Sequence, residues 1–259
     1  LLVLRTCGVR AYLSTPELRG LLALSVAVAS AGAMVIVNTV VYVRERLGGT
    51  DTDTAIMLAA SGAGSLAVAL VLPRLLDRYP DRAFMLCGGF ALALGLALAL
   101  TGPGFVLLLP VWLLLGAASS MVQTPAGRLL RRSAHAADRP ALYAAQFALS
   151  HACWLFAYPF AGWVGATMGL DAAFGALAII AFAATAAAAV IWQGDDSLEL
   201  EHTHDAMRHE HLHVHDEHHQ HVHDGSEGPE PHRHPHRHAP LRHRPPFVID
   251  SHHPVWPVR

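Results

Sequence analysis

Lysine is absent from this chain of 259 residues, and its 18 strongly basic side chains are all arginines. The three cysteines, Cys7, Cys87 and Cys153, are scattered without C-x-x-C spacing, which argues against a disulfide framework and a thiolate metal site. Charged residues make up only 15% of the chain, and none lies in the middle of its long apolar runs. These runs therefore supply no carboxylate for a proton relay or an acidic metal site inside a membrane.

The chain consists of two parts that differ in composition. Residues 1–193 are almost wholly apolar and hold two of the 19 histidines, whereas residues 194–259 hold the other 17 and most of the acidic residues. The second part has few side chains able to form a core, so we predict a disordered, His-rich tail. The expected organisation is a leading segment over 1–18, a membrane domain over 19–193 and the tail over 194–259.

Six apolar stretches of the first part are long enough to cross the hydrocarbon core of a bilayer as helices. They are Leu21–Val43, Ala55–Leu76, Phe84–Leu100, Gly104–Val122, Ala141–Met168 and Ala172–Trp192. The first has a clear start signal, because Thr15 can cap the helix and Pro16 suits its first position. The predicted fold is an all-α membrane protein with six transmembrane helices, surrounded by the lipid bilayer.

Arginines are distributed unevenly between the loops that join these helices. Ten lie in the segments 1–19, 74–82 and 123–140, which fall on one side of the membrane. The alternate loops carry only Arg44 and Arg46. Because cytoplasmic loops are enriched in arginine and lysine, we predict a multi-pass protein of the cell (inner or plasma) membrane with both ends of the chain in the cytoplasm.

The fifth stretch carries a polar and aromatic face. On a helical wheel this face consists of Tyr143, Gln146, Phe147, Ser150, His151, Trp154 and Tyr158. His151 can bind a cation, shuttle a proton or hydrogen-bond to a neighbouring helix, and Asn38 of the first stretch should also face protein or a cavity. The predicted substrate pathway is Asn38, Gln146, Ser150, His151, Trp154 and Tyr158.

The loop between the second and third stretches reads "PRLLDRYPDR", residues 73–82. It resembles the cytoplasmic signature G-x-x-x-D-R-x-G-R-[RK] of the major facilitator superfamily, with Asp77, Arg78 and Arg82 in register. The resemblance implies that these three residues form a charge-pair latch that biases gating. The alternative is a short basic loop that only follows the arginine bias of cytoplasmic loops.

This sequence departs from the signature at three positions, where Pro73 and Pro80 replace glycines and Asp81 replaces a basic residue. The number and spacing of the stretches still resemble the C-terminal six-helix half of such a transporter. The resemblance implies that an N-terminal six-helix half, missing from this chain, is its partner. "FALSHACWLFAYPFAGWVG" followed by a His-rich tail is similar to the nickel-resistance permease branch of the superfamily.

The tail contains a run of closely spaced histidines. They are His209, His211, His213, His215, His218, His219, His221 and His223. In an extended or a helical conformation this run can gather two to four imidazoles, which suit Ni, Co, Zn and Cu ions. A second cluster, residues 232–238, contains proline and arginine and should bind metal less well. The alternative is an inert soluble tail.

These features favour a secondary transporter, a proton-coupled exporter of a divalent transition metal such as nickel or cobalt, with the tail as metal collector. Two alternatives stay open: a drug or small-molecule exporter of the same superfamily, and a membrane protein that buffers or senses metal. We expect no enzymatic activity, since "GAGS" (62–65) lacks the glycine that would complete a GxSG nucleophile motif. We expect no required cofactor and no nucleic-acid partner.

Overall fold

The computed structural model describes residues 2–134 and 138–192, with side chains from residue 8 onward, and the backbone of four short strands between 202 and 243. The helices belong to one unit of the chain and the strands to another. In the first unit the apolar stretches fold into long helices, as their length and composition predict.

The first helices run almost without interruption from residue 2 to residue 46. Helix α1 covers Leu2–Ser14, in the leading segment expected to be a loop end. Helix α2 covers Pro16–Ala33, with the predicted proline in its first turn. It continues through the π-helical segment η1 (Met34–Asn38), α3 (Thr39–Val41) and the π-helical segment η2 (Tyr42–Arg46).

Five more helices follow. They are α4 (Asp51–Leu76), α5 (Asp81–Leu100), α6 (Phe105–Arg132), α7 (Arg139–Met168) and α8 (Leu170–Ile191). A capping box between Thr50 and Asp53 fixes the start of α4, because each residue hydrogen-bonds the other's backbone N–H. The fourth apolar stretch predicts a span that ends at Val122, but α6 continues ten residues further and includes Pro125.

Among the residues that the structure describes, five helices are long and apolar enough to cross a membrane. They are Pro16–Arg46, Asp51–Leu76, Asp81–Leu100, Phe105–Arg132 and Leu170–Ile191. The expected fifth stretch also forms a helix, α7, of 30 residues. It does not belong to this group of five, because polar residues such as Gln146 and His151 lower its hydropathy.

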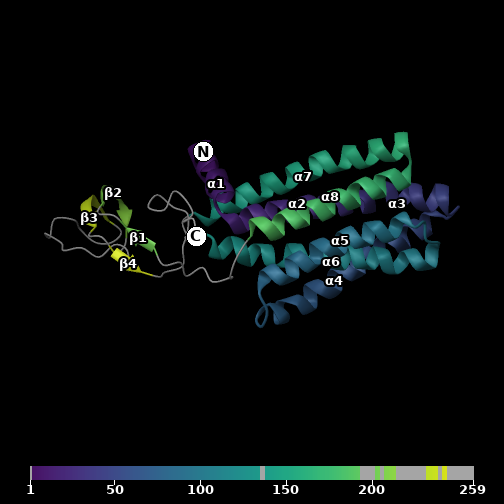
Figure 1. Cartoon of the computed structure of the whole chain (residues 1–259), viewed down its shortest axis with the longest axis horizontal. Coiled ribbons are helices and arrows are strands. Elements are labelled where there is room, and N and C mark those ends of the chain that lie inside the picture. Colours follow the sequence, from purple (N-terminus) through teal and green to yellow (C-terminus); the bar gives the residue numbers. More distant parts are fainter. Residues whose placement is uncertain are drawn as a thin grey trace. The chain divides into compact units, whose positions relative to one another are not determined.

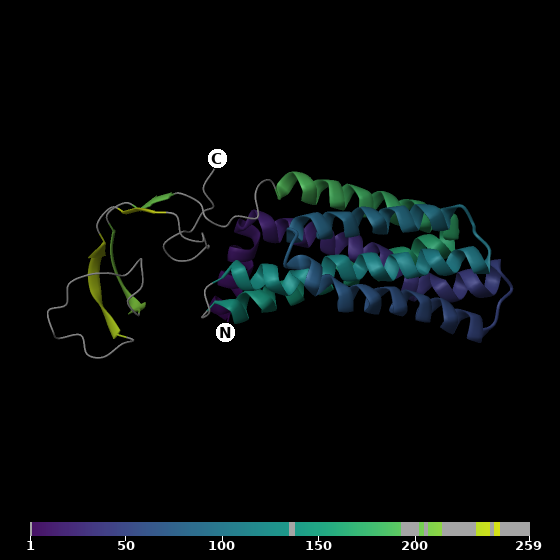
Figure 2. The ribbon, with the colours of Figure 1, turned by 90° about the horizontal axis from the view of Figure 1, so that it is seen from below.

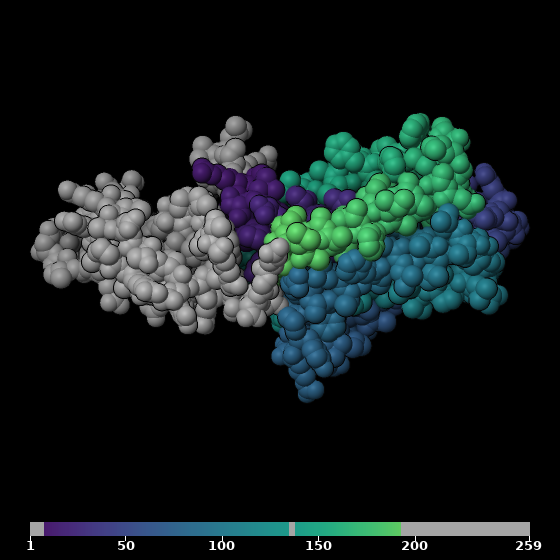
Figure 3. All heavy atoms as spheres, viewed as in Figure 1, coloured from purple at the N-terminus to yellow at the C-terminus, as the bar shows by residue number. Residues whose placement is uncertain are grey.

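The helices pack side by side along their lengths (Figures 1 and 2). Helix α6 packs against α4 and α5, while α2 packs against α8 and α7, and α5 contacts α8 to join the two groups. Figure 3 shows α5 and α8 lying next to each other on one face of the molecule. Helices α6 and α7 make few contacts with each other, although both pack against α2.

Small residues allow the closest of these helix contacts. A Cβ atom on Gly64 would lie 2.0 Å from the carbonyl oxygen of Leu113, and one on Gly116 would lie 1.8 Å from that of Ser61. Both glycines therefore let the backbones of α4 and α6 touch. This agrees with the general use of small residues at membrane helix contacts, where lipid offers no hydrophobic drive for association.

An aromatic cluster fills the core next to η2. Tyr42, Trp112 and Phe174 are buried, with ring centroids 5.8 to 6.2 Å apart. The Tyr42 hydroxyl donates to the carbonyl oxygen of Pro103 at 2.9 Å, and the Trp112 indole N–H donates to Oγ1 of Thr39 at 2.8 Å. Both polar tips are thus satisfied inside an apolar core, as buried tyrosine and tryptophan require.

The second unit contains four short strands. They are β1 (His202–His204), β2 (Met207–His213), β3 (His232–His238) and β4 (Leu241–His243). Strand β1 pairs antiparallel with β4, and β2 pairs antiparallel with β3. We predict disorder throughout this region, and these four strands differ from that prediction. The remainder of the tail lies outside the described residues, and for it disorder stays a prediction.

Candidate functional site

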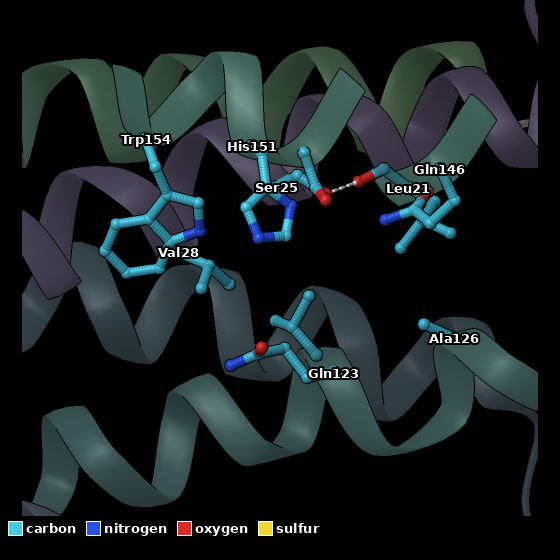
Figure 4. Close-up of a pocket in the computed structure, with 10 residues that line it drawn as sticks. Leu21, Ser25, Val28, Gln123, Ala126, Gln146, His151 and Trp154 are labelled. Atoms are coloured by element: carbon cyan, nitrogen blue, oxygen red, sulfur yellow. Dashed lines mark hydrogen bonds between the residues drawn. The ribbon is translucent and has the colours of Figure 1, made fainter. Parts of the chain in front are cut away.

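A cavity of about 340 Å³ lies between α2, α6 and α7 (Figure 4). Its lining residues are Leu21, Ser25 and Val28 from α2, Val122, Gln123 and Ala126 from α6, and Gln146, Ser150, His151 and Trp154 from α7. The volume falls in the lower part of the usual range for small-molecule sites, roughly 300–1,000 Å³. Both α6 and α7 line the cavity, and these two helices make few direct contacts with each other.

Four of the six residues predicted to form the substrate pathway line this cavity together: Gln146, Ser150, His151 and Trp154. Tyr158 is not part of this lining, but its ring centroid lies 5.1 Å from that of Trp154. Asn38 is placed elsewhere. It is buried at the end of η1, where its amide nitrogen donates to the carbonyl oxygen of Ala161 at 3.2 Å and so joins η1 to α7.

The His151 ring is held by its own helix. Its Nδ1 lies 2.8 Å from the carbonyl oxygen of Phe147. A carbonyl oxygen only accepts, so Nδ1 carries the hydrogen, and the neutral ring keeps its acceptor lone pair on Nε2. The Phe147 ring stacks on the imidazole with centroids 3.9 Å apart, which fixes the ring plane. His151 therefore offers one oriented acceptor nitrogen for a proton or a ligand.

Polar groups from α1, α2 and α6, which are not among the residues that the sequence pattern predicts, also belong to the site or contact it. Ser25 of α2 donates to the carbonyl oxygen of Leu21 at 2.9 Å, and Gln123 of α6 completes the opposite wall. The hydroxyl of Tyr12, in α1, hydrogen-bonds Oε1 of Gln146. Gln123 has a sequence signal, since it lies in a polar stretch that follows an apolar run. Tyr12 has none, because it contacts a residue 134 positions away.

The lining of this cavity contains no acidic side chain. Within the part of the chain that the structure describes, no group of three or more His, Cys, Asp or Glu residues is placed to hold a metal ion. His209, His211 and His213 of the predicted metal cluster lie in β2, in register with His236, His234 and His232 of β3. The cluster's other members, His215, His218, His219, His221 and His223, lie outside the described residues.

Among the described residues, no ion pair joins the three residues of the predicted latch, whose gating role stays a prediction. Asp77 ends α4 and is exposed, as is Arg78. Arg82 instead donates hydrogen bonds to the carbonyl oxygens of Trp192 at 2.7 Å and Ala189 at 2.9 Å. It thereby satisfies carbonyl groups at the C-terminal end of α8 and neutralises the partial negative charge of that end.

Asp81 is the centre of the ion pairs at this end of the helices. It stands at a position where the family signature has a basic residue. Its buried carboxylate accepts hydrogen bonds from Arg128 and, at 3.1 Å, from Arg132. Arg132 also lies 3.9 Å from a carboxylate oxygen of Glu17. Through these contacts α5, α6 and the start of α2 share one charge network.

The helices and the cavity define a multi-pass membrane protein with a polar site between its helices. Comparison with family models matches residues 22–247 to the Major Facilitator Superfamily, and the chain belongs to this family. Members of the family are transporters, so the chain is a membrane transporter. No curated protein matches it. The predicted superfamily is thereby confirmed, whereas the nickel-resistance branch stays a prediction.

Proposed function

We propose that this chain forms the transport domain of a secondary transporter that exports a small organic solute, with the cavity between α2, α6 and α7 as the substrate site. The observation that supports this best is the cavity's chemistry. It combines amides, hydroxyls, one imidazole and an indole, without a carboxylate. Such neutral hydrogen-bonding groups beside aromatic surface suit an organic molecule with a polar and an apolar part.

His151 is the proton-handling group in this proposal. It is exposed at the cavity, and its Nδ1 is occupied by the Phe147 carbonyl, so proton binding falls to Nε2. Binding a proton there changes the cavity from neutral to cationic. That change can weaken the hold on a substrate and thereby couple proton movement to release.

Helix α7 is the sixth membrane span in this arrangement. Its 30 residues are ample to cross the hydrocarbon core, and Gln146, Ser150 and His151 line the cavity. The end that carries Arg82, Arg128 and Arg132 then faces the cytoplasm, in keeping with the arginine bias of cytoplasmic loops. The expected N-terminal six-helix half would close the open side of the cavity.

A divalent transition metal such as nickel or cobalt is the second candidate cargo. It is favoured by the 17 histidines after residue 193, which would collect the ion on the cytoplasmic side. The cavity itself supports it less, because His151 is the only lining residue with a strong metal ligand. A related candidate is metal buffering or sensing, in which the tail binds the ion and the helices transport nothing.

Transport in membrane vesicles distinguishes these cargoes. Two fluorescent solutes, norfloxacin with acceptor oxygens and ethidium without them, are compared with Ni²⁺ under an imposed proton gradient. We expect gradient-driven movement of an organic solute that is lost in His151→Gln. Thr167→Ala is the matched control, since Thr167 lies on α7 and bonds only its own helix.

Movement of Ni²⁺ but of neither organic solute would overturn the leading cargo in favour of the second. Deletion after Gln193 then separates collection from transport. If the tail only collects metal, deletion weakens Ni²⁺ movement without abolishing it. If deletion removes every Ni²⁺-dependent property and the helical part moves nothing, buffering or sensing is the function.

A further inference from the structure

Helix α1 lies directly on the first turns of α7. A Cβ atom on Gly8 would lie 2.5 Å from the carbonyl oxygen of Ala141, so the two backbones touch at this point. Four residues further along α1, Tyr12 is fully buried. The contact at Gly8 therefore brings the Tyr12 side chain to the end of the cavity nearest to Gln146.

The bond between Tyr12 and Gln146 has one direction. The amide oxygen Oε1 can only accept, so the tyrosine hydroxyl donates to it. Burial raises the pKa of Tyr12, and the nearby Cys153 raises it further. The phenol therefore keeps its proton under physiological conditions and stays a donor.

The amide nitrogen of Gln146 is left for the cavity. Figure 4 shows this nitrogen directed from Gln146 toward the space in front of His151. A free glutamine amide can turn either its oxygen or its nitrogen to a ligand. Because Oε1 accepts the hydrogen bond from Tyr12, the Gln146 amide offers the cavity only its two N–H donors.

We infer that Tyr12 is a positioning residue that makes the Gln146 end of the cavity a hydrogen-bond donor subsite for an acceptor oxygen of the cargo. This inference rests on the proposed function, because it takes the cavity as the substrate site. The cavity then presents two unlike hydrogen-bonding groups, a fixed donor at Gln146 and an acceptor at His151 Nε2, and His151 lies between Gln146 and Trp154 (Figure 4). A solute with a carbonyl or carboxylate oxygen at one end and a donor at the other fits both.

Preorganisation is the physical reason for such an arrangement. A mobile glutamine loses side-chain freedom when it binds a ligand, which weakens the bond that it makes. Tyr12 has already removed this freedom before the cargo arrives. A fixed donor also discriminates between solutes. It favours norfloxacin, which has acceptor oxygens, over ethidium, which has none.

The orientation of Gln146 is testable without transport. The chain has only four glutamines, Gln123, Gln146, Gln193 and Gln220, so selective ¹⁵N labelling gives four side-chain amide signals. The signal that disappears in Gln146→Ala should shift in Tyr12→Phe. Tyr143→Phe is the matched control, because the Tyr143 hydroxyl donates its hydrogen bond to the carbonyl oxygen of Gly127, at 2.8 Å, and not to Gln146.

Exchange of the amide hydrogens with water decides the direction of the bond. With the nitrogen toward the cavity, both hydrogens of the Gln146 signal exchange readily in the unmodified protein. Protection of one of them, or an unchanged signal in Tyr12→Phe, would overturn the inference. This result does not depend on which cargo is transported.

Transport kinetics test the subsite itself. Tyr12→Phe should raise the KM for norfloxacin about fivefold, the size of one ordinary hydrogen bond, and leave kcat and the KM for ethidium unchanged. In a Gln146→Ala background the same change should have no further effect, because the two residues act through one bond. Equal effects on both solutes, or additive effects of the two substitutions, would contradict the donor subsite. If the unmodified protein moves neither solute, the proposed cargo fails, and the amide signals alone decide the role of Tyr12.

Discussion

Arg128 donates hydrogen bonds to both carboxylate oxygens of Asp81, with Nε 3.0 Å from Oδ1 and 3.2 Å from Oδ2. The same guanidinium also donates to the carbonyl oxygen of Leu76 at 2.8 Å. A single side chain of α6 therefore ties the start of α5 to the end of α4. The carboxylate is fully buried, whereas the Arg128 side chain is 36% exposed.

Asp81→Asn should destabilise the domain because it leaves Arg128 and Arg132 without their shared counter-charge. Breaking a fully buried pair costs about 3–5 kcal/mol, and the exposure of Arg128 reduces our expectation to about 2 kcal/mol. Thermal unfolding of the protein in detergent measures the loss. Asp77→Asn is the control, since Asp77 is exposed. Equal losses for both substitutions would contradict the role given to Asp81.

The pair of Asp81 and Arg128 shows which contacts sequence patterns do not predict. The apolar runs predict the helices, because each helix must bury its backbone polar groups in its own hydrogen bonds to enter a membrane. The signature in the loop 73–82 directs attention to Asp77 and Arg78. It gives no sign that Asp81 meets an arginine 47 residues later, because that contact depends on how α5 and α6 pack.

Gly64→Ala should weaken the contact between α4 and α6. Its new Cβ would lie 2.0 Å from the Leu113 carbonyl oxygen, and a backbone atom cannot move aside as the tip of a side chain can. We expect the midpoint of thermal unfolding to fall by several degrees, as for a loss of about 2 kcal/mol. Gly62→Ala, on the same helix with no atom within 4 Å of the new Cβ, should be neutral or slightly stabilising. A similar fall in both variants would show that helix contact is not the cause.

Tyr12 should make the packing of α1 sensitive to alkali. Its folded-state pKa is raised above the ordinary value of 10.0 by burial. The neutral form is favoured in the folded state, so this contribution to stability is complete below pH 10 and falls as the pH rises further. Each pH unit in that window costs about 1.4 kcal/mol. Unfolding measured at pH 8 and pH 11 should show a larger loss in the unmodified protein than in Tyr12→Phe. Equal losses in the two proteins would contradict a buried, neutral Tyr12.

The candidate site was predictable only on the helix that carries most of it. The helical wheel of α7 groups Gln146, Ser150, His151 and Trp154, and the structure places them in one cavity, because a single helix fixes which of its own residues share a face. Asn38 looked equivalent in the sequence. Its amide instead joins η1 to α7, because the carbonyl oxygen of Ala161 lies within hydrogen-bond distance of it. Contacts between helices decide such cases.

Gly32→Ala should narrow the cavity without breaking the fold. A Cβ atom on Gly32 would lie 2.0 Å from the outer edge of the Trp154 ring, so the indole packs over this glycine. The obstructing atom is the far end of a side chain, which can turn away, and we expect it to turn into the cavity that Trp154 lines. We expect normal thermal stability and a several-fold rise in KM for any transported solute, since the loss is one of volume rather than of a particular hydrogen bond. Gly162→Ala serves as the control, because its new Cβ would meet only a methyl group of Val37 at 3.7 Å, an ordinary contact. An unchanged KM in Gly32→Ala with normal stability would mean that the space beside Trp154 is not on the substrate pathway.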